Sequence, residues 1–240
     1  MKTETTDTHV GVNLARRSFF KLAGVGAASV GLLAVSSCRK MENSRVNSLN
    51  SLNSTQMNGS IDIGSGDLGV LNYAYALEQL EAAFYTQVVA TPYKGMDSGQ
   101  LHCFKVIRQH EVCHREFFKA ALDSNAIPAL TPDFSKIDFT SGASVIGTAK
   151  AFEDLGVQAY DGAGYLIKNA DYLTIAGKIV SVEARHAAYI RNLVKFGDYA
   201  GSDVVDSNGL NKASTIAEVL AIANTFLKTK VSASNYGYTA

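Results

Sequence analysis

"QHEVCHREF", residues 109–117, places Glu111 and His114 three positions apart in a stretch with helical periodicity. Side chains three apart on an α-helix lie on the same face, so these two point in one direction. One such pair is ordinarily part of a solvated helix surface. The same spacing returns in "SVEARHAAY" as Glu183 and His186. Because the chain has only five histidines, chance is a poor explanation for two copies.

Five segments of the chain carry a helical period, and almost nothing in the sequence predicts a strand. The two Glu-x-x-His pairs fall in the second and the fourth of these segments. The five segments cover, approximately, residues 67–92, 98–122, 144–168, 171–197 and 214–230, of which the last is the shortest.

The connections between these segments indicate which helical fold they form. Two of the links are short, whereas residues 123–143 form a long link with no evident element of its own. Twenty extended residues reach about 65 Å and a 24-residue helix is about 36 Å long, so this link can return along a whole bundle. One long crossover between two helical hairpins is typical of the ferritin-like arrangement. The sequence therefore predicts an all-α, ferritin-like four-helix bundle over residues 67–198, with the crossover between helices 2 and 3 and a short fifth helix in a C-terminal extension, residues 199–240.

The other two long helices each offer a glutamate at a matching position. When "ALEQLEAAFY" is aligned with "AFEDLGVQAY", Glu78 matches Glu153 and Tyr85 matches Tyr160. The step of seven residues from acid to phenol is nearly two helical turns, so each glutamate shares a face with its tyrosine. The tyrosines are predicted to be core aromatics, with a hydrogen bond to a ligand or an electron relay as the alternative.

Glu81 is an alternative to Glu78 as the ligand from the first helix. It aligns with Gly156, which makes Glu78 the preferred ligand and Glu81 the second choice, although both can face inward. Four other polar residues of these helices are expected on the helix surface, with a role as outer partners of the ligands as the alternative for the last two: His102, His110, Asp154 and Arg185.

The assembled positions resemble the ligand set of di-iron and di-manganese carboxylate proteins in the ferritin-like superfamily: Glu78, Glu111, His114, Glu153, Glu183 and His186. The phrases "LEQLEAAFY", "FEDLGVQAY" and "EARHAAYIR" are most similar to a bacterial branch of exported ferritin-like domain proteins, related to desiccation-associated proteins. The resemblance covers residues 67–198. It implies two bound iron ions, or manganese ions, and oxygen or peroxide as reaction partners.

Such a ligand set needs cations to neutralise the charge of its carboxylates. Four carboxylates that face one another inside a bundle repel and lose hydration, at a cost of several kcal/mol each unless protons or cations neutralise them. Two divalent ions supply the four positive charges required. Carboxylate oxygens with two neutral imidazoles suit iron or manganese better than a thiolate-preferring metal.

The first forty residues have a composition of their own. "ARRSFFKLAG" carries Arg16 and Arg17, and the following Gly/Ala/Val/Leu stretch ends in "GLLAVSSC" at Cys38. This segment resembles a twin-arginine export signal with a lipoprotein cleavage box, and its apolar run is shorter than the about 20 residues of a membrane-spanning helix. The resemblance implies removal of residues 1–37, lipidation of Cys38 and a place in the cell envelope or periplasm, with the lipid as the only membrane contact. Residues 38–66, rich in Asn, Ser and Gly, are predicted to be a flexible tether.

The charge composition narrows the range of functions. The chain has 22 Lys and Arg against 22 Asp and Glu and no basic cluster interleaved with aromatics, which argues against a nucleic-acid partner. The leading interpretation is an envelope di-metal protein that oxidises ferrous iron or removes peroxide or oxygen. A manganese catalase activity would differ from it in the metal and in access to the site. The competing interpretation is a non-catalytic, stress-related structural or binding protein on the same bundle.

Overall fold

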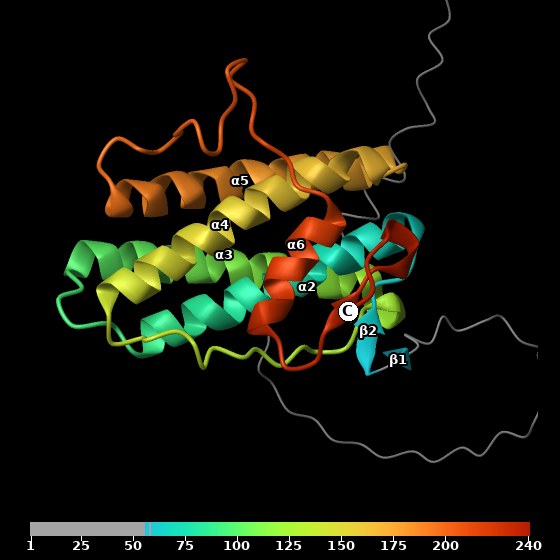
Figure 1. Cartoon of the computed structure of the whole chain (residues 1–240), viewed down its shortest axis with the longest axis horizontal. Coiled ribbons are helices and arrows are strands. Elements are labelled where there is room, and N and C mark those ends of the chain that lie inside the picture. The colour runs from blue at the N-terminus through green and yellow to red at the C-terminus, as the bar shows by residue number, and fades with distance from the viewer. Residues whose placement is uncertain (1–55, 58) are drawn as a thin grey trace, which may run out of the picture. The chain divides into compact units, whose positions relative to one another are not determined.

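Four long helices form the body of the folded unit in the computed structural model, which describes residues 56, 57 and 59–240. In chain order they are α2 (Gly66–Ala90), α3 (Ser98–Leu122), α4 (Gly142–Ala163) and α5 (Ala170–Val194). α2 packs along α3 and α4 packs along α5, so the bundle consists of two helical hairpins (Figure 1). The predicted four-helix bundle is confirmed. The predicted export signal with Arg16 and Arg17, the lipidation site Cys38 and most of the predicted tether lie outside the described residues.

Side chains at the helix starts determine where three of the long helices begin. Asp97 accepts a hydrogen bond from the backbone N–H of Gln100 at 2.8 Å, and the Gln100 side chain accepts one from the Asp97 N–H, which together form a capping box for α3. Ser141 caps α4, and Asn169 accepts two backbone N–H groups from the first turn of α5. These caps satisfy N–H groups that have no partner inside the helix.

The start of α2 is held in a different way. Ser65 precedes the helix without a side-chain cap. Asp67, in the first turn, instead accepts the backbone N–H groups of Lys168 at 2.8 Å and Asn169 at 2.9 Å. One carboxylate therefore ties the beginning of the first hairpin to the turn of the second.

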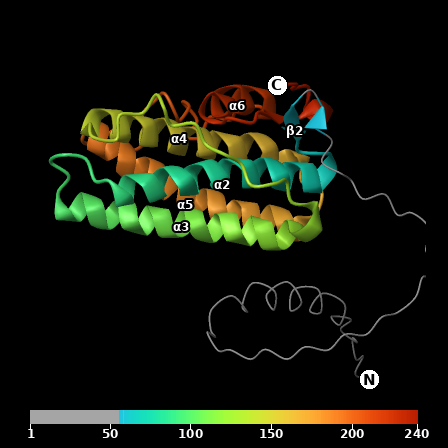
Figure 2. The same ribbon diagram turned by 90° about the horizontal axis from the view of Figure 1, so that it is seen from below.

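The connection between α3 and α4 follows the length of the bundle, as its number of residues predicts (Figures 1 and 2). It opens with the short helix η1 (Asp123–Asn125). Two buried amide side chains of α2 bind its backbone: Asn72 accepts from the N–H of Ile127 at 2.9 Å, and Gln79 accepts from the N–H of Leu130 at 2.7 Å. The crossover thus satisfies the buried side-chain oxygen of each residue, whereas Nε2 of Gln79 has no hydrogen-bond partner among the described residues.

The C-terminal extension packs back onto the bundle. Its helix α6 (Ile216–Ala223) starts at a capping box on Thr215 and contacts α2 and α4, and Figure 2 shows it on the same side of the bundle as α4. The chain passes α4 so closely that a methyl group on Gly162 would collide with the backbone of Ser214. Three further single-turn helices complete the described elements of this type: η2 (Gly164–Leu166), η3 (Asn224–Phe226) and η4 (Ser234–Tyr236).

A small sheet lies at one end of the bundle, where no strand was predicted. The central strand pairs antiparallel with the first and parallel with the third, with Ile61 opposite Val231. Ile61 and Ile63 are buried, so the prediction of a flexible tether through residue 66 is wrong at its C-terminal end. The partner strand lies near the other end of the chain, and a local pattern cannot indicate it. The strands are β1 (Gln56–Met57), β2 (Ser60–Asp62) and β3 (Val231–Ser232).

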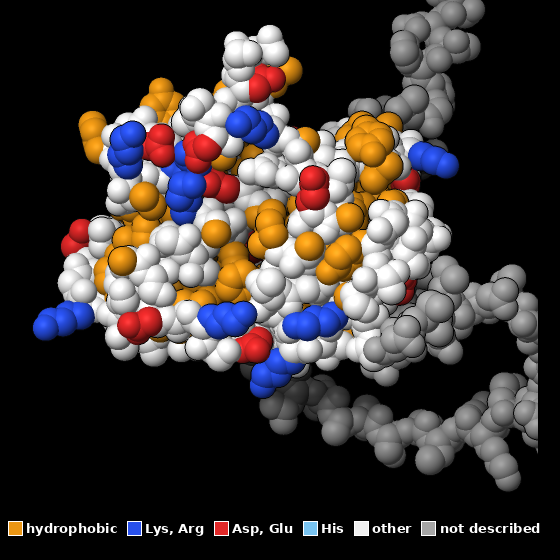
Figure 3. All heavy atoms as spheres, viewed as in Figure 1, with side chains coloured by type: hydrophobic (Ala, Val, Ile, Leu, Met, Phe, Trp, Pro, Cys, Tyr) orange, Lys and Arg blue, Asp and Glu red, His pale blue; other side chains and the backbone are white. Residues whose placement is uncertain are grey.

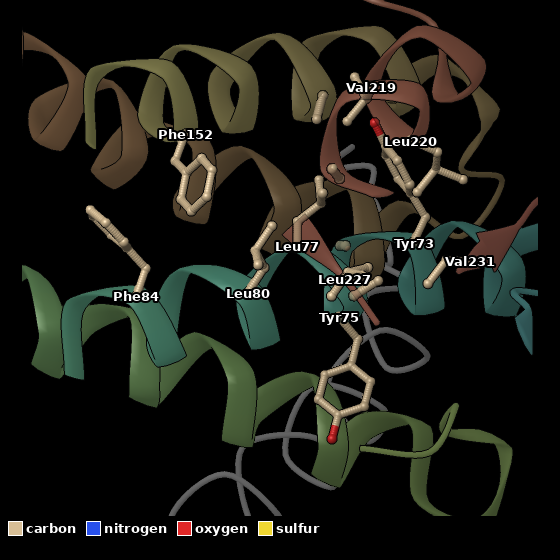
Figure 4. Packing of buried hydrophobic residues seen from close by; sticks show 14 of the residues in the cluster. Tyr73, Tyr75, Leu77, Leu80, Phe84, Phe152, Val219, Leu220, Leu227 and Val231 are labelled. Carbon is tan, nitrogen blue, oxygen red and sulfur yellow. The ribbon is translucent and has the colours of Figure 1, made fainter. Parts of the chain in front are cut away.

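Figure 4 shows aromatic and aliphatic side chains of α2, α4 and α6 in the core, to which α3, α5 and the strands also contribute. Phe84 of α2 and Phe152 of α4 point toward each other, with ring centroids 5.1 Å apart and planes inclined by 64°. This edge-to-face geometry adds to the free energy gained by burying both rings. Further along α2, Tyr73 reaches toward Val219 and Leu220 of α6.

The surface is charged in both signs. On the face shown in Figure 3, Lys and Arg side chains alternate with Asp and Glu, so no extended field of one sign covers it. Among the described residues, no helix combines the length and the apolar character needed to cross a membrane.

Candidate metal centre

The six predicted ligand residues meet inside the bundle, and all four long helices contribute to them. The four glutamate side chains are between 0% and 1% exposed, and the His114 and His186 side chains are 13% and 5% exposed. The three-residue spacing in α3 and α5 places a carboxylate and an imidazole of each helix on the same inward face. The contributions are Glu78 from α2, Glu111 and His114 from α3, Glu153 from α4, and Glu183 and His186 from α5.

These residues form two overlapping groups of four. In each group the candidate ligand atoms lie within 4.8 Å of one another. Glu111 and Glu183 belong to both groups, so the two groups share two carboxylates. Two more residues complete each group: Glu78 and His114 in one, Glu153 and His186 in the other.

Both histidines direct Nδ1 at the carboxylates. Nδ1 of His114 lies 2.8 Å from Glu183 Oε1 and 3.5 Å from Glu78 Oε2. Nδ1 of His186 lies 2.9 Å from Glu111 Oε1 and 3.4 Å from Glu183 Oε2. Each imidazole thus faces oxygens from two other helix positions at once, as a ligand to a shared ion would.

The polar atoms at the centre form no hydrogen bond of normal geometry within the described part of the chain and have one another as their close neighbours, which tests whether a cation fits. Buried polar atoms are normally hydrogen-bonded, and an unpaired buried carboxylate costs several kcal/mol. An oxygen-rich set with imidazole nitrogens matches the preferences of hard divalent cations such as iron or manganese, so the residues present fit metal binding. The unpartnered atoms are Glu78 Oε2, both carboxylate oxygens of Glu111, Glu153 Oε2, both carboxylate oxygens of Glu183, His114 Nδ1 and His186 Nδ1.

Two tyrosines hold the remaining oxygens of the terminal carboxylates. The hydroxyl of Tyr85 on α2 donates to Glu153 Oε1 on α4 at 2.5 Å, and the hydroxyl of Tyr160 on α4 donates to Glu78 Oε1 on α2 at 2.5 Å. Both tyrosines lie in or against the hydrophobic core as predicted, and the hydrogen-bonding alternative also describes both residues. Each phenol reaches across to the other hairpin and leaves Oε2 of its partner directed at the centre.

Without a cation, burial dominates the protonation of these acids. Burial raises the pKa of Glu153 from 4.5 to about 7, although His186 opposes the shift. Burial also raises the pKa of Glu78, and that of Glu111 rises well above its usual value because of burial and then the charge of Glu183. In the metal-free protein, protons therefore take part of the role that cations would have.

For the two histidines and Glu183, neighbouring charged groups outweigh the effect of burial on the pKa. Burial alone would lower the pKa of His114, but Glu183 and Glu78 raise it to about 10. Burial likewise opposes protonation of His186, yet Glu111 and the neighbouring carboxylates raise its pKa to about 12. Burial would raise the pKa of Glu183, but the two histidines lower it to about 2. Metal binding at Nδ1 would displace the protons that the histidines otherwise carry.

Glu81 is a fifth buried acid beside the centre. It is 5% exposed and belongs to neither group of candidate ligand atoms, whereas Glu78 belongs to one. Burial raises the pKa of Glu81 well above its usual value, with further contributions from Glu111 and Glu153. A Cβ at Gly156 would lie 3.2 Å from its Oε1, so the glycine makes room for this carboxyl group.

His110 is the part of the site that the sequence reasoning missed. Its Nδ1 lies 2.8 Å from Nε2 of His186, and the two rings are inclined by only 12° with centroids 5.1 Å apart. The prediction that His110 is merely a surface residue is therefore wrong, whereas His102 is exposed as predicted. A signal was available, because His110 precedes the ligand His114 by four positions, which is about one helical turn.

The remaining polar residues do not contact the ligands. Asp154 pairs with Arg191 at 2.8 Å and Lys150 at 2.9 Å, and Arg185 donates to the carbonyl of Ser181. Their role as outer partners of the ligands is not found. Arg191, which is 1% exposed, is instead a buried structural cation that the sequence reasoning did not single out.

The fold and this centre define a carboxylate-rich helical bundle that can hold metal ions. The family model described as ferritin-like domain matches residues 66–195. The chain belongs to the ferritin-like domain family, and the predicted ferritin-like resemblance is confirmed. A search of curated proteins finds no match.

Proposed function

We propose that this chain is an envelope-located di-metal carboxylate protein that oxidises ferrous iron or removes peroxide or oxygen. One observation carries the proposal: eight buried polar atoms of six residues converge, with close contacts to one another and no hydrogen bond of normal geometry to any described residue. Two iron ions, or two manganese ions, held there would supply redox chemistry with oxygen or peroxide. All six residues act as ligands in this proposal, with Glu111 and Glu183 shared between the ions.

The chain's own residues prepare the centre for this chemistry. The phenols of Tyr85 and Tyr160 each engage one oxygen of Glu153 and Glu78, and this fixes which oxygen is left for a cation. Burial of the carboxylates excludes bulk water, which strengthens their attraction for a cation. His114 is the most exposed of the six side chains, so its side of the centre is the more accessible to a small oxidant.

The envelope location rests on the N-terminal sequence. The pair Arg16 and Arg17 and the "GLLAVSSC" box at Cys38 support export by the twin-arginine route and a lipid anchor. That route carries folded proteins, which suits a protein whose metal is inserted before export. A tethered and lipidated subunit is poorly suited to forming an iron-storage shell.

A second candidate function is a non-catalytic, stress-related structural or binding role on the same bundle. The observation that favours it is the burial of the four carboxylates at 0–1% exposure, which restricts the approach of a substrate larger than oxygen or peroxide. In this case the ions would stabilise the fold and would not turn over.

Metal analysis combined with an oxidant challenge tests the proposal. We expect protein produced through its own export route to contain two iron or manganese ions per chain, and the double variant Glu111→Gln/Glu183→Gln to contain none. The matched control is Glu116→Gln, an exposed acid of α3 whose loss should leave the metal content unchanged. Circular dichroism checks that the variants remain helical.

The same samples separate the two candidate functions. Addition of ferrous iron or peroxide, followed by oxygen consumption and visible absorbance, should show turnover in the wild type and in Glu116→Gln. Retention of two ions by the double variant would refute the ligand assignment. Two bound ions without consumption of oxygen or peroxide would favour the structural role.

A further inference from the structure

The two candidate histidine ligands differ in the hydrogen-bond partner of the ring nitrogen that faces away from the carboxylates, Nε2. In His186, Nδ1 faces the carboxylates and Nε2 lies 2.8 Å from Nδ1 of His110. In His114, Nδ1 also faces the carboxylates, but within the part of the chain that the structure describes no hydrogen bond reaches its Nε2. The two halves of the centre are therefore unequal just outside the ligands.

The sequences of the two hairpins also differ at the position that contacts the ligand histidine. When Glu111 and His114 are aligned with Glu183 and His186, the position of His110 is occupied by Val182 in the other hairpin. Valine offers no side-chain acceptor. Only one of the two candidate ligand imidazoles thus has a second imidazole within hydrogen-bond distance.

The hydrogen bond between the two rings determines which nitrogen of His186 is free for a cation. An imidazole that binds a cation through Nδ1 carries its proton on Nε2. In His186 that proton points at His110, so Nδ1 of His110 accepts it and His110 carries its own proton on Nε2. Such a partner fixes the tautomer and the ring orientation of a metal ligand and raises its basicity.

We propose that His110 is a positioning residue that holds His186 in the ligating tautomer and makes the two metal positions unequal in affinity. The position formed by Glu111, Glu153, Glu183 and His186 fills first, and the position that includes His114 fills second. The inference rests on the proposed binding of two metal ions at this centre. Loss of a partner of this kind lowers metal affinity by about 10- to 100-fold.

Titration of the chelator-treated full chain with cobalt(II) tests the inference, because the visible bands of cobalt report on its coordination. We expect two binding steps in the wild type. His110→Leu should weaken the tighter step by about 10- to 100-fold, bring the two steps together and shift the bands of the first ion. His102→Leu, on the same helix and exposed, should behave as the wild type does.

Two amide variants separate positioning from general structural effects. Asparagine places its side-chain oxygen near the position of the histidine Nδ1, so His110→Asn should restore the tighter step and its spectrum. Glutamine places its oxygen near the position of Nε2, so His110→Gln should not. Urea denaturation of the metal-free variants checks that all of them fold.

The outcomes are distinct for this inference and for the proposed function. Two unequal steps that merge in His110→Leu and separate again in His110→Asn support it. Wild-type titration curves in His110→Leu, or equal weakening in the Asn and Gln variants, would overturn it while two-metal binding stands. A wild-type chain that binds no cobalt, manganese or ferrous iron would overturn both.

Discussion

Removal of the metal should make the stability of the bundle depend strongly on pH, because protons must then replace cations at the centre. The pKa shift of Glu153 gives the size of this change in unfolding free energy. Burial raises its pKa from 4.5 to about 7 in the folded protein. A group whose pKa is raised by folding stabilises the fold fully below the unfolded value, and this contribution is lost as the pH rises through the folded value. The difference of about 2.5 units corresponds to about 3 kcal/mol of unfolding free energy lost between pH 4.5 and pH 7.

Over this pH range, the other acids of the centre either lower the unfolding free energy as the pH rises or leave it unchanged. The pKa values of Glu78, Glu81 and Glu111 are also raised, chiefly by burial, so their contributions are likewise lost as the pH rises. The pKa of Glu183 is lowered to about 2 because the two histidines outweigh its burial, and its contribution is constant above pH 4.5. No acid of the centre opposes the predicted fall in stability.

The histidines extend the fall to higher pH. Carboxylates raise the pKa of His114 to about 10 and that of His186 to about 12 against the effect of burial, so their stabilisation begins to be lost only above pH 6.5. His110 is the exception, because burial and then the charge of His186 lower its pKa. The contribution of His110 to the unfolding free energy therefore rises with pH below 6.5. This single residue opposes the trend set by the acids.

Urea denaturation followed by far-UV circular dichroism at pH 5, 6, 7 and 8 measures this dependence on chelator-treated protein. We expect the wild type to lose at least about 3 kcal/mol across the range, and Glu153→Gln, which cannot ionise, to lose about 3 kcal/mol less. Glu116→Gln, a change at an exposed acid, should follow the wild type. Manganese added back should flatten the wild-type curve. A flat curve for the metal-free wild type, or the same slope in Glu153→Gln, would refute the reasoning.

Two further predictions concern single groups. Tyr85→Phe removes the 2.5 Å hydrogen bond to Glu153 and should lower the unfolding free energy by about 1 to 3 kcal/mol, whereas Tyr73→Phe removes a buried hydroxyl that has no partner and should cost nothing or stabilise slightly; equal losses in urea denaturation would contradict this account. Gly162→Ala should lower the melting temperature because its methyl group meets backbone, while Gly177→Ala, in a helix with open space around it, should stabilise by up to about 1 kcal/mol; the opposite order of melting temperatures would show that the C-terminal segment does not press on α4 as described.

The sequence predicts the bundle because its strongest patterns are local and repeated. The two Glu-x-x-His pairs and the long crossover specify two hairpins and their connection, and the structure has both. Local patterns could not predict the sheet, because Ile61 pairs with Val231, a residue near the other end of the sequence of the folded unit. The role of Asp67 was likewise not predictable, because its partners Lys168 and Asn169 belong to another hairpin.

The candidate site shows the same division between local and long-range information. Spacing along one helix identifies which side chains share a face, and it brings the six residues together. Contacts between helices depend on how each helix is rotated about its axis, and one residue changes this rotation by about 100°. His110 lies about one turn before His114 and therefore close to the ligand face of α3, but only the packing of α3 against α5 brings it to His186. Helical spacing alone does not contain that contact.

The centre also acts on the docking of the two hairpins. Within each hairpin the helices pack along their length, but the acids of the two hairpins face one another and would repel if all were charged. The phenols of Tyr85 and Tyr160 each donate one hydrogen bond across the interface, which satisfies one oxygen of each terminal carboxylate and leaves the rest of the charge uncompensated. α6 contacts α2 of one hairpin and α4 of the other, and the crossover joins the hairpins covalently, so both remain linked in the metal-free bundle. Cations or protons must then neutralise the remaining carboxylate charge. Metal binding, protonation of the acids and docking of the two hairpins are therefore thermodynamically linked.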